Sequence, residues 1–454
     1  MVRRASWTMA VICAVWFGWL TYLTLHRFHG LHFGAFDLGI FDQGMWLIAN
    51  GHEPFVTLRG LHLLGDHASY LLYLLAPLYW LWEEVRLLLL LTVLIPVVAG
   101  WLSYRIARVE GLRPWHSVIV GTTVLLMPAM LWTPWDAFHP ETFAIALIPA
   151  SYLAARKGKH TLALILAALV LLAKEDAGLT IAPYALYWWW RWRDARKHAY
   201  VLAALAVGVT ALSLFVVLPG HSPTGELIYT GRYSDLAATL TWSRLYYLVG
   251  MIVPGLAALR APAFLLLGLP VTLANLLSTH TYQSELRWHY TAYLLGVLAV
   301  AVPLGSARWT EGSPDRLASR RLALAGLVAL VAMLVIGPDL HTRSGLWGGL
   351  DARERAEVAA ILDAIPPDAS VTATWSLTPH LSHRREIYTS PNPFRESYWG
   401  AEHLPPLPDP STVEYLAIDT RNFSGPEDPM PDVMLRPEYE TVVDGETFKL
   451  LRRR

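Results

Sequence analysis

Apolar residues fall in runs close to the length that crosses about 30 Å of hydrocarbon as a helix. The first run covers residues 7–25 and follows Arg3 and Arg4. It is too long for the core of a signal peptide and no small-residue cleavage site follows it, so we interpret it as a retained membrane span. Ten further spans are predicted at residues 87–104, 117–132, 142–155, 161–173, 178–190, 200–218, 245–259, 262–277, 291–304 and 322–336.

Basic residues indicate which loops face the cytoplasm. If the N-terminus is cytoplasmic and the spans alternate, most lysines and arginines before residue 338 fall on inner loops, as the positive-inside rule expects. Residues 68–82 are apolar but short, and a crossing there would reverse this bias. We therefore predict a re-entrant or interfacial helix on the outer face at 68–82. The result is a multi-pass plasma-membrane protein with eleven spans.

The tail after residue 337 is rich in proline and charge, and it has no run long enough to span a membrane. Its predicted elements are an amphipathic helix at 351–364, strands at 370–374 and 413–418, and a hairpin at 439–451. An odd number of spans places this tail outside the cytoplasm. The predicted organisation is an all-α membrane domain at 1–337, with a first outer loop at 28–68, and an extracytoplasmic α/β domain at 338–454.

Composition supports the membrane class. Apolar residues make up 54% of the 454 residues and charged residues 16%, whereas soluble domains carry about 25% charge. Basic and acidic residues are equal at 36 each, which excludes a basic nucleic-acid binder. The 20 tryptophans suit a protein with side chains at a bilayer interface. A single cysteine, Cys13, allows no internal disulfide and no cysteine-based metal cluster.

Acidic residues and imidazoles gather on the predicted outer face, where ionisable groups beside hydrocarbon are costly and often functional. Avoidance of the negative inner surface explains part of this asymmetry. In the first outer loop, Asp37 opens a predicted amphipathic helix that ends at Gly51, and capping that helix is an equally good interpretation of Asp37 alone. Asp42 points to another face of the same helix. Asp66 and His67 form an adjacent carboxylate and imidazole suited to a metal or a phosphate.

The loop after the third predicted span carries a second group of candidates. His139 and Glu141 flank Pro140 at the start of a helix, which gives two potential ligands a fixed geometry. Asp136 precedes them, and helix capping is the simpler interpretation of that aspartate.

The loop after the fifth span contains Lys174, Glu175 and Asp176, three charges between two apolar runs. An ordinary turn fits this pattern, but a lysine beside two acids suits a phosphate or metal–phosphate site better. Further positive groups on the same predicted face are Arg232, Arg244, Arg287 and His289.

Several of these motifs occur in an order that is similar to a known family. They are FDLGIFDQ, GDH, FHPE, KEDAGL, YTGRYS, NLLS followed by a His-Tyr pair, and PHLSHRREIY in the tail. Together they resemble the bacterial membrane-protein family called domain of unknown function 2079. That family in turn resembles the GT-C glycosyltransferases, which take sugars from polyprenyl-phosphate carriers. The resemblance implies a multi-span helical body, a long first outer loop and an extracytoplasmic C-terminal domain.

Two positions of the GT-C pattern match this chain and two differ. Asp37 takes the acidic position after the first span, and Gly51 takes the glycine near the end of the following helix. Leu38 stands where many of those enzymes have a second acid. Asp66-His67-Ala68 stands where relatives have a lysine and two prolines.

The resemblance implies transfer of a sugar from polyprenyl phosphate to an extracytoplasmic glycan, lipid or protein. Asp37 would act as general base, with inversion at the anomeric carbon. The expected substrate and phosphate ligands are Lys174, Arg232, Arg287, His289, Asp42, Glu175 and Asp176. The expected ligands of a Mg²⁺ or Mn²⁺ ion are Asp66, His67, His139 and Glu141. Two alternatives remain: a transporter or channel-like protein with an outer ionisable site, and a receptor that uses its C-terminal domain.

Overall fold

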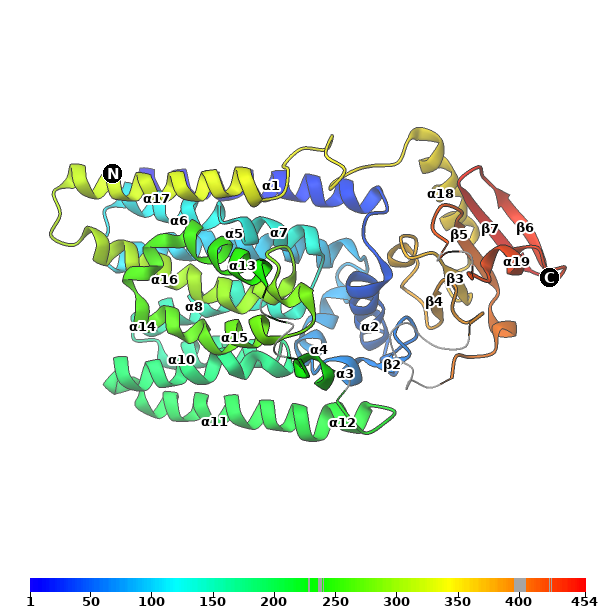
Figure 1. The fold of residues 1–454 in the computed structure, drawn as a ribbon, viewed down its shortest axis with the longest axis horizontal. Coiled ribbons are helices and arrows are strands. Elements are labelled where there is room, and N and C mark those ends of the chain that lie inside the picture. The colour runs from blue at the N-terminus through cyan, green and yellow to red at the C-terminus, as the bar shows by residue number, and fades with distance from the viewer. Residues whose placement is uncertain (228, 236–238, 240, 396–405, 424, 426) are drawn as a thin grey trace. The chain divides into compact units, whose positions relative to one another are not determined.

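The chain folds into two units, each assembled from separate stretches of sequence (Figure 1). The computed structural model describes residues 1–227, 229–235, 239, 241–395, 406–423, 425 and 427–454. The first unit comprises Met1–Thr24, Leu90–Val216 and Ile228–Leu340, and the second comprises Leu25–Leu89, Val217–Leu227 and His341–Arg454. The first outer loop therefore belongs to the same unit as the tail.

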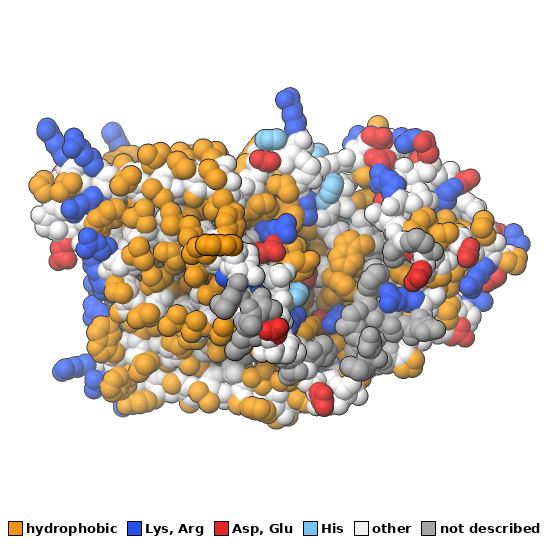
Figure 2. All heavy atoms as spheres, viewed as in Figure 1, with side chains coloured by type: hydrophobic (Ala, Val, Ile, Leu, Met, Phe, Trp, Pro, Cys, Tyr) orange, Lys and Arg blue, Asp and Glu red, His pale blue; other side chains and the backbone are white. Residues whose placement is uncertain are grey.

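The first unit is a bundle of helices that contains most of the predicted spans. Its helices are α1 (Val2–His29), α5 (Arg86–Val109), α6 (Pro114–Leu125), α7 (Pro128–Asp136), α8 (Ala144–Arg156), α9 (His160–Leu171), α10 (Gly178–Arg191), α11 (Arg196–Leu212), α13 (Trp242–Ile252), α14 (Pro262–Leu265), α15 (Leu269–Leu277), α16 (Ala292–Thr310) and α17 (Asp315–Ile336). Apolar side chains cover the visible face of this bundle (Figure 2). Among the exposed ones are Phe215, Leu334 and Val335, at 77%, 72% and 73% exposure. An apolar outer surface is what contact with hydrocarbon requires.

Helix α16 forms the centre of the bundle, because its residues are buried on every side from Ala292 to Ser306. A helix that is apolar all round is typical of such a position. Gly296 allows α16 to lie directly against α8, since a Cβ atom there would lie 2.5 Å from the carbonyl oxygen of Ala144. This close approach fixes the starts of α8 and α16 next to each other.

The expected count of eleven spans is not confirmed. Among the described residues, six helices are long and apolar enough to cross a membrane, or seven if α6 and α7, bent by 47°, form one span. Helices α8, α9 and α10 contain 13, 12 and 14 residues, which at ~1.5 Å per residue is well short of ~30 Å. The third predicted span is broken where Pro128 begins α7, because proline lacks the N–H that would continue the preceding helix.

The second unit combines the first outer loop with a small sheet. Its elements are α2 (Ile40–Ala49), β1 (Phe55–Val56), β2 (Leu61–His62), α3 (Leu63–Asp66), α4 (Leu71–Leu75), α12 (Leu218–His221), α18 (Ala352–Ala364), β3 (Val371–Ala373), β4 (Ile387–Thr389), β5 (Tyr415–Asp419), α19 (Met430–Met434), β6 (Tyr439–Asp444) and β7 (Phe448–Arg453). The strand order is β4-β3-β5-β7-β6. Strand β3 is parallel to β4 and β5, whereas β7 is antiparallel to β5 and β6.

The predicted elements of the tail are confirmed within a few residues, namely helix α18, strands β3 and β5, and the β6–β7 hairpin. Asp351 caps α18 by accepting a hydrogen bond from the backbone N–H of Glu354. Strands β4 and β1–β2 were not predicted. Residues 68–82, predicted as one interfacial helix, form α4 followed by the 3-10 helix Ala76–Trp80.

Candidate functional site

Three helices of the first unit begin beside the predicted charged motifs. Helix α8 follows the short helix Pro140–Phe143, α10 follows Glu175–Ala177, and α16 follows His289–Thr291. Hydrogen bonds and ion pairs join the side chains of these three motifs. We call Asp136, His139, Glu141, Lys174, Asp176 and His289 the acid–imidazole site.

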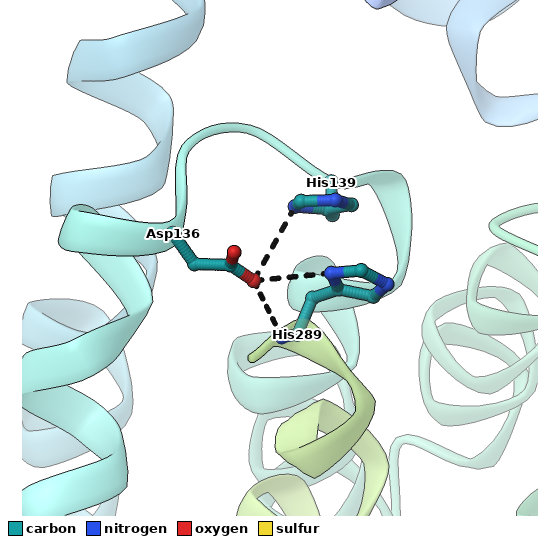
Figure 3. Close-up of side chains that lie close together, drawn as sticks. All are labelled: Asp136, His139 and His289. Carbon is teal, nitrogen blue, oxygen red and sulfur yellow. Dashed lines mark hydrogen bonds and ion pairs between the residues drawn. The ribbon is translucent and has the colours of Figure 1, made fainter. Parts of the chain in front are cut away.

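Asp136 connects two imidazole rings (Figure 3). Its Oδ2 atom accepts a hydrogen bond of 2.5 Å from the backbone N–H of His289 and lies 3.0 Å from Nδ1 of the same residue. The Nδ1 atom of His139 lies 3.8 Å from that oxygen. The two rings are stacked, with centroids 3.5 Å apart and planes at 19°. All three side chains are largely buried, so their interactions are only weakly screened by water.

Glu141 and Lys174 extend the site from the other side of His289. The Lys174 Nζ atom donates a hydrogen bond of 3.1 Å to Oε1 of Glu141, and both side chains are buried. The same carboxylate oxygen lies 3.7 Å from Nε2 of His289. The ring of His289 therefore lies between the carboxylates of Asp136 and Glu141.

Burial and neighbouring charges together determine the protonation of Lys174 and Asp176. Burial by itself would lower the pKa of Lys174, but Glu141 and Asp176 raise that pKa well above its usual value, so Lys174 is an ammonium ion. Burial raises the pKa of Asp176 to about 6, and the Tyr293 hydroxyl donates a hydrogen bond of 3.0 Å to its Oδ1 atom. The site therefore holds a permanent positive charge and a carboxyl that titrates near neutral pH.

Several predicted ligands thus meet in this site, whereas Arg287 and Arg232 contact residues outside it. Arg287 forms an ion pair of 2.8 Å with Glu285, and its side chain is 46% exposed. Arg232 lies over the ring of Tyr229, 4.1 Å from its centroid. Glu175 acts electrostatically on Lys174 and Asp176. The roles of Arg232, Arg287 and Glu175 in substrate binding stay predictions.

Sequence reasoning gave Asp136 the role of a helix cap, but the structure places it at the last position of α7. A negative side chain at a helix C-terminus opposes the helix dipole and does not stabilise that end. The next residue, Ala137, has a φ of +82°, which L side chains rarely adopt. The signal available in the sequence was the Asp136-x-x-His139 spacing, which places a carboxylate and an imidazole three residues apart in one short loop.

The donor atoms of Asp136, His139 and His289 are suited to a metal ion. One donor atom from each residue lies within 4.8 Å of the others. Two imidazole nitrogens and one carboxylate oxygen are ligands that Mn²⁺ or Zn²⁺ accepts more readily than Mg²⁺, which prefers oxygen. Of the predicted ligands, Asp66 and His67 belong to the second unit, where Asp66 forms an ion pair of 3.4 Å with Arg59.

Asp37 and Asp42 lie at the start of the predicted helix in the second unit, which forms α2 and ends with Gly51 at a φ of +70°. Asp37 is half-buried in the turn Ala35–Gly39, with φ +65° and ψ −87°. A residue other than glycine in this region is strained, and such strain often occurs at functional positions. Asp42 is fully buried; its Oδ1 atom accepts a hydrogen bond of 2.5 Å from the Tyr79 hydroxyl.

The fold and this site define an integral membrane protein with a buried group of ionisable side chains at helix ends. The chain belongs to the predicted membrane protein family DUF2079, whose model matches residues 27–432. This confirms the family expected from the motifs. No similar protein was found among curated protein sequences.

Two solved structures of ArnT from Cupriavidus metallidurans are similar to the chain over nearly its whole length. The structure bound to undecaprenyl phosphate has a TM-score of 0.59 and 12% identity, with 98% of this chain and 97% of that chain covered. The apo structure has a TM-score of 0.55 and 12% identity, with 97% and 98% covered. The expected resemblance to GT-C glycosyltransferases is thereby confirmed as a likeness of fold.

Proposed function

We propose that this protein is a membrane glycosyltransferase that moves a sugar from a polyprenyl-phosphate carrier to an extracytoplasmic acceptor. The observation that carries the proposal is the acid–imidazole site, where Lys174 and His289 both contact the buried carboxylate of Glu141 near the starts of three helices. The whole-chain likeness to ArnT, which was solved with undecaprenyl phosphate bound, supports the choice of carrier.

The acid–imidazole site offers part of the positive charge that a departing lipid phosphate needs. The Lys174 ammonium and the positive dipole ends of the helical segments that begin at Pro140, Glu175 and His289 attract an anion. Asp136 holds the ring of His289, so its imidazole is oriented before substrate binds. Preorganised donors in a water-poor site stabilise developing negative charge more strongly than donors in water.

A divalent ion would complete this charge balance. The carboxylates of Glu141, Asp176 and Glu175 act on the ammonium of Lys174. Asp136 adds a further negative charge beside His289, so a phosphate needs additional positive charge. Asp136, His139 and His289 would hold the ion, which would supply Lewis-acid stabilisation to the phosphate oxygens. This donor set favours Mn²⁺ over Mg²⁺.

Asp37 would activate the acceptor. Its carboxylate would remove the proton of the acceptor hydroxyl while that oxygen attacks the anomeric carbon. The bond between the anomeric carbon and the phosphate oxygen breaks, and polyprenyl phosphate leaves with the bonding electrons. A single displacement of this kind inverts the anomeric configuration. The strained backbone of Asp37 supports a functional role for this side chain.

The test measures release of lipid phosphate from radiolabelled polyprenyl-phosphate sugars by the purified protein in vesicles. We expect Asp37→Asn to reduce release about 10²- to 10⁴-fold, the usual contribution of a general base. Glu226→Gln, an exposed acid of the same unit, is the matched control and should retain full activity. Full release by Asp37→Asn would exclude this base, and no release from any donor sugar would exclude the transferase. Removal of metal by a chelator should lower release, and Mn²⁺ should restore it.

A further inference from the structure

The helices that begin at the acid–imidazole site end around a separate cavity of about 380 Å³. The cavity is lined by Tyr152 near the end of α8, by Tyr187 and Arg191 of α10, and by Arg308 of α16. Helix α16 has 19 residues, so at ~1.5 Å per residue its two ends are about 28 Å apart. The cavity is therefore at the opposite membrane face from the acid–imidazole site.

The floor of the cavity is polar and fixed in position. Tyr152 and Tyr187 are buried, and the Tyr152 hydroxyl donates a hydrogen bond of 3.1 Å to Oε1 of Glu110. The Nε atom of Arg156 donates to the same oxygen at 2.9 Å. Glu110 is thus anchored from two sides at the wall of the cavity. A cavity of this size with a few placed polar groups has the properties of a ligand site.

The rim of the cavity carries charges of both signs. Arg191 and Arg308 lie in the last turns of two different helices, and Glu311 lies just beyond α16. The Nη1 atom of Arg308 donates a hydrogen bond of 3.1 Å to the carbonyl oxygen of Arg260, which fixes one end of its guanidinium. Helix C-termini contribute partial negative charge. A ligand with both an anionic and a cationic group matches this rim better than a simple anion.

Tryptophans beside the rim indicate that it lies at the depth of lipid headgroups. Trp189 and Trp190 immediately precede Arg191 and are 38% and 63% exposed. Trp309 follows Arg308 directly. Tryptophans concentrate at the boundary between headgroups and hydrocarbon. A headgroup entering from the adjacent leaflet therefore reaches this cavity without crossing the bilayer.

We propose that this cavity binds the headgroup of a zwitterionic phospholipid, whose phosphate and ammonium groups fit the charges of the rim. Arg191 and Arg308 bind the phosphate ester, because guanidinium groups form charge-assisted hydrogen bonds with phosphate oxygens. Glu110 and Glu311 bind the ammonium group. The lipid holds the ends of α8, α10 and α16 together at the face opposite the acid–imidazole site. This site is independent of glycosyl transfer.

The test uses the full chain in mild detergent and measures bound lipid by native mass spectrometry during titration with phosphatidylethanolamine or phosphatidylglycerol. We expect tighter binding of phosphatidylethanolamine. Each substitution Arg191→Gln and Arg308→Gln should weaken that binding about tenfold, as loss of a charge-assisted hydrogen bond predicts. The matched control is Arg316→Gln with Arg320→Gln, which removes two exposed arginines of α17 and should leave binding unchanged.

Further measurements distinguish the source of the headgroup and keep the proposal open to refutation. Glu311→Gln should reduce the preference for phosphatidylethanolamine over phosphatidylglycerol, and this readout does not require the arginine variants to fold. Phosphoethanolamine without acyl chains should compete poorly. Equal binding by the arginine variants and the wild type would overturn the proposal. So would equal affinity for the two lipids, or competition by phosphoethanolamine as strong as that of the lipid.

Discussion

Each unit of the protein contains a buried aspartate next to an imidazole, but the two aspartates have different surroundings. In the second unit, Asp42 is fully buried and binds the hydroxyls of Tyr79 and Ser382 and the Nε2 atom of His383. In the first unit, Asp136 binds His289, and the other nitrogen of that ring lies near Glu141, which is paired with Lys174.

The difference lies in how much charge each group holds. The contacts of Asp42 join α2 and the Tyr79 segment to the tail at Ser382 and His383, so they hold the second unit together. The acid–imidazole site adds Glu141, Lys174 and Asp176 to its aspartate. Buried charges of this number rarely improve stability compared with apolar side chains. We infer that the Asp42 group serves folding and that the acid–imidazole site serves function.

Asp42→Ala should have the largest effect on stability. The substitution leaves Tyr79, Ser382 and His383 without their buried acceptor, which should lower the free energy of unfolding by about 3–5 kcal/mol. Thermal unfolding of the detergent-solubilised protein measures this loss. Asp432 is an exposed acid of the same unit, and Asp432→Ala should change the free energy of unfolding by less than about 0.5 kcal/mol. A melting temperature like that of the wild type would show that Asp42 does not hold this unit together.

Asp136→Ala should show the reverse pattern, with a smaller loss of stability and a larger loss of activity. It removes the acceptor for the His289 backbone N–H, which should cost about 1–3 kcal/mol. Loss of the group that orients the imidazole should reduce lipid-phosphate release about 10- to 100-fold. Both values are measured on one preparation, by thermal unfolding and by the release assay. A large fall in melting temperature without loss of activity would place Asp136 with Asp42 among the structural groups.

The sequence alone predicts those elements whose ends are marked by residues next to them in the chain. Asp351 and Glu354 form a capping pair at the start of α18, and Gly51 ends α2 with a positive φ. The number of spans was harder to predict, because an apolar run shows that a segment is hydrophobic but not where its helix breaks. Pro128 marks the break between α6 and α7, but a proline within an apolar run does not show by itself whether the helix kinks or ends.

Part of the candidate site was predictable, because the alternation of spans placed several of its residues on the same predicted membrane face. His139, Glu141 and Lys174 follow predicted spans and His289 precedes one, all on the same predicted face, and the structure joins them. Asp136 was harder to assign, because a short acid beside a helix suits capping and ligation equally well. The partners of Asp42 lie some 340 positions along the chain at Ser382 and His383, a separation at which no local pattern indicates contact.

The smallest predicted effect is the contribution of the Asp42 group to the dependence of stability on pH. Burial opposes the charged form of His383, but Asp42 raises its pKa above the usual value, which is about 6.5. The folded protein therefore binds this proton more tightly than the unfolded chain. The stabilisation is fully present below about pH 6.5 and is lost as the pH rises through the higher folded-state pKa.

His383→Gln should therefore abolish the fall in melting temperature above about pH 6.5. His380 provides an internal control whose effect on stability has the opposite pH dependence, because burial lowers the pKa of its ring to about 4. Its contribution declines as the pH falls from about 6.5 towards that value, and His380→Gln should remove only this acid-side decline. Melting curves of the three proteins between about pH 4 and pH 8.5 separate the two slopes. If the melting temperature of His383→Gln still falls above about pH 6.5, then the Asp42 carboxylate does not stabilise the protonated ring of His383. In that case the hydroxyls of Tyr79 and Ser382 are the only donors that matter to this carboxylate.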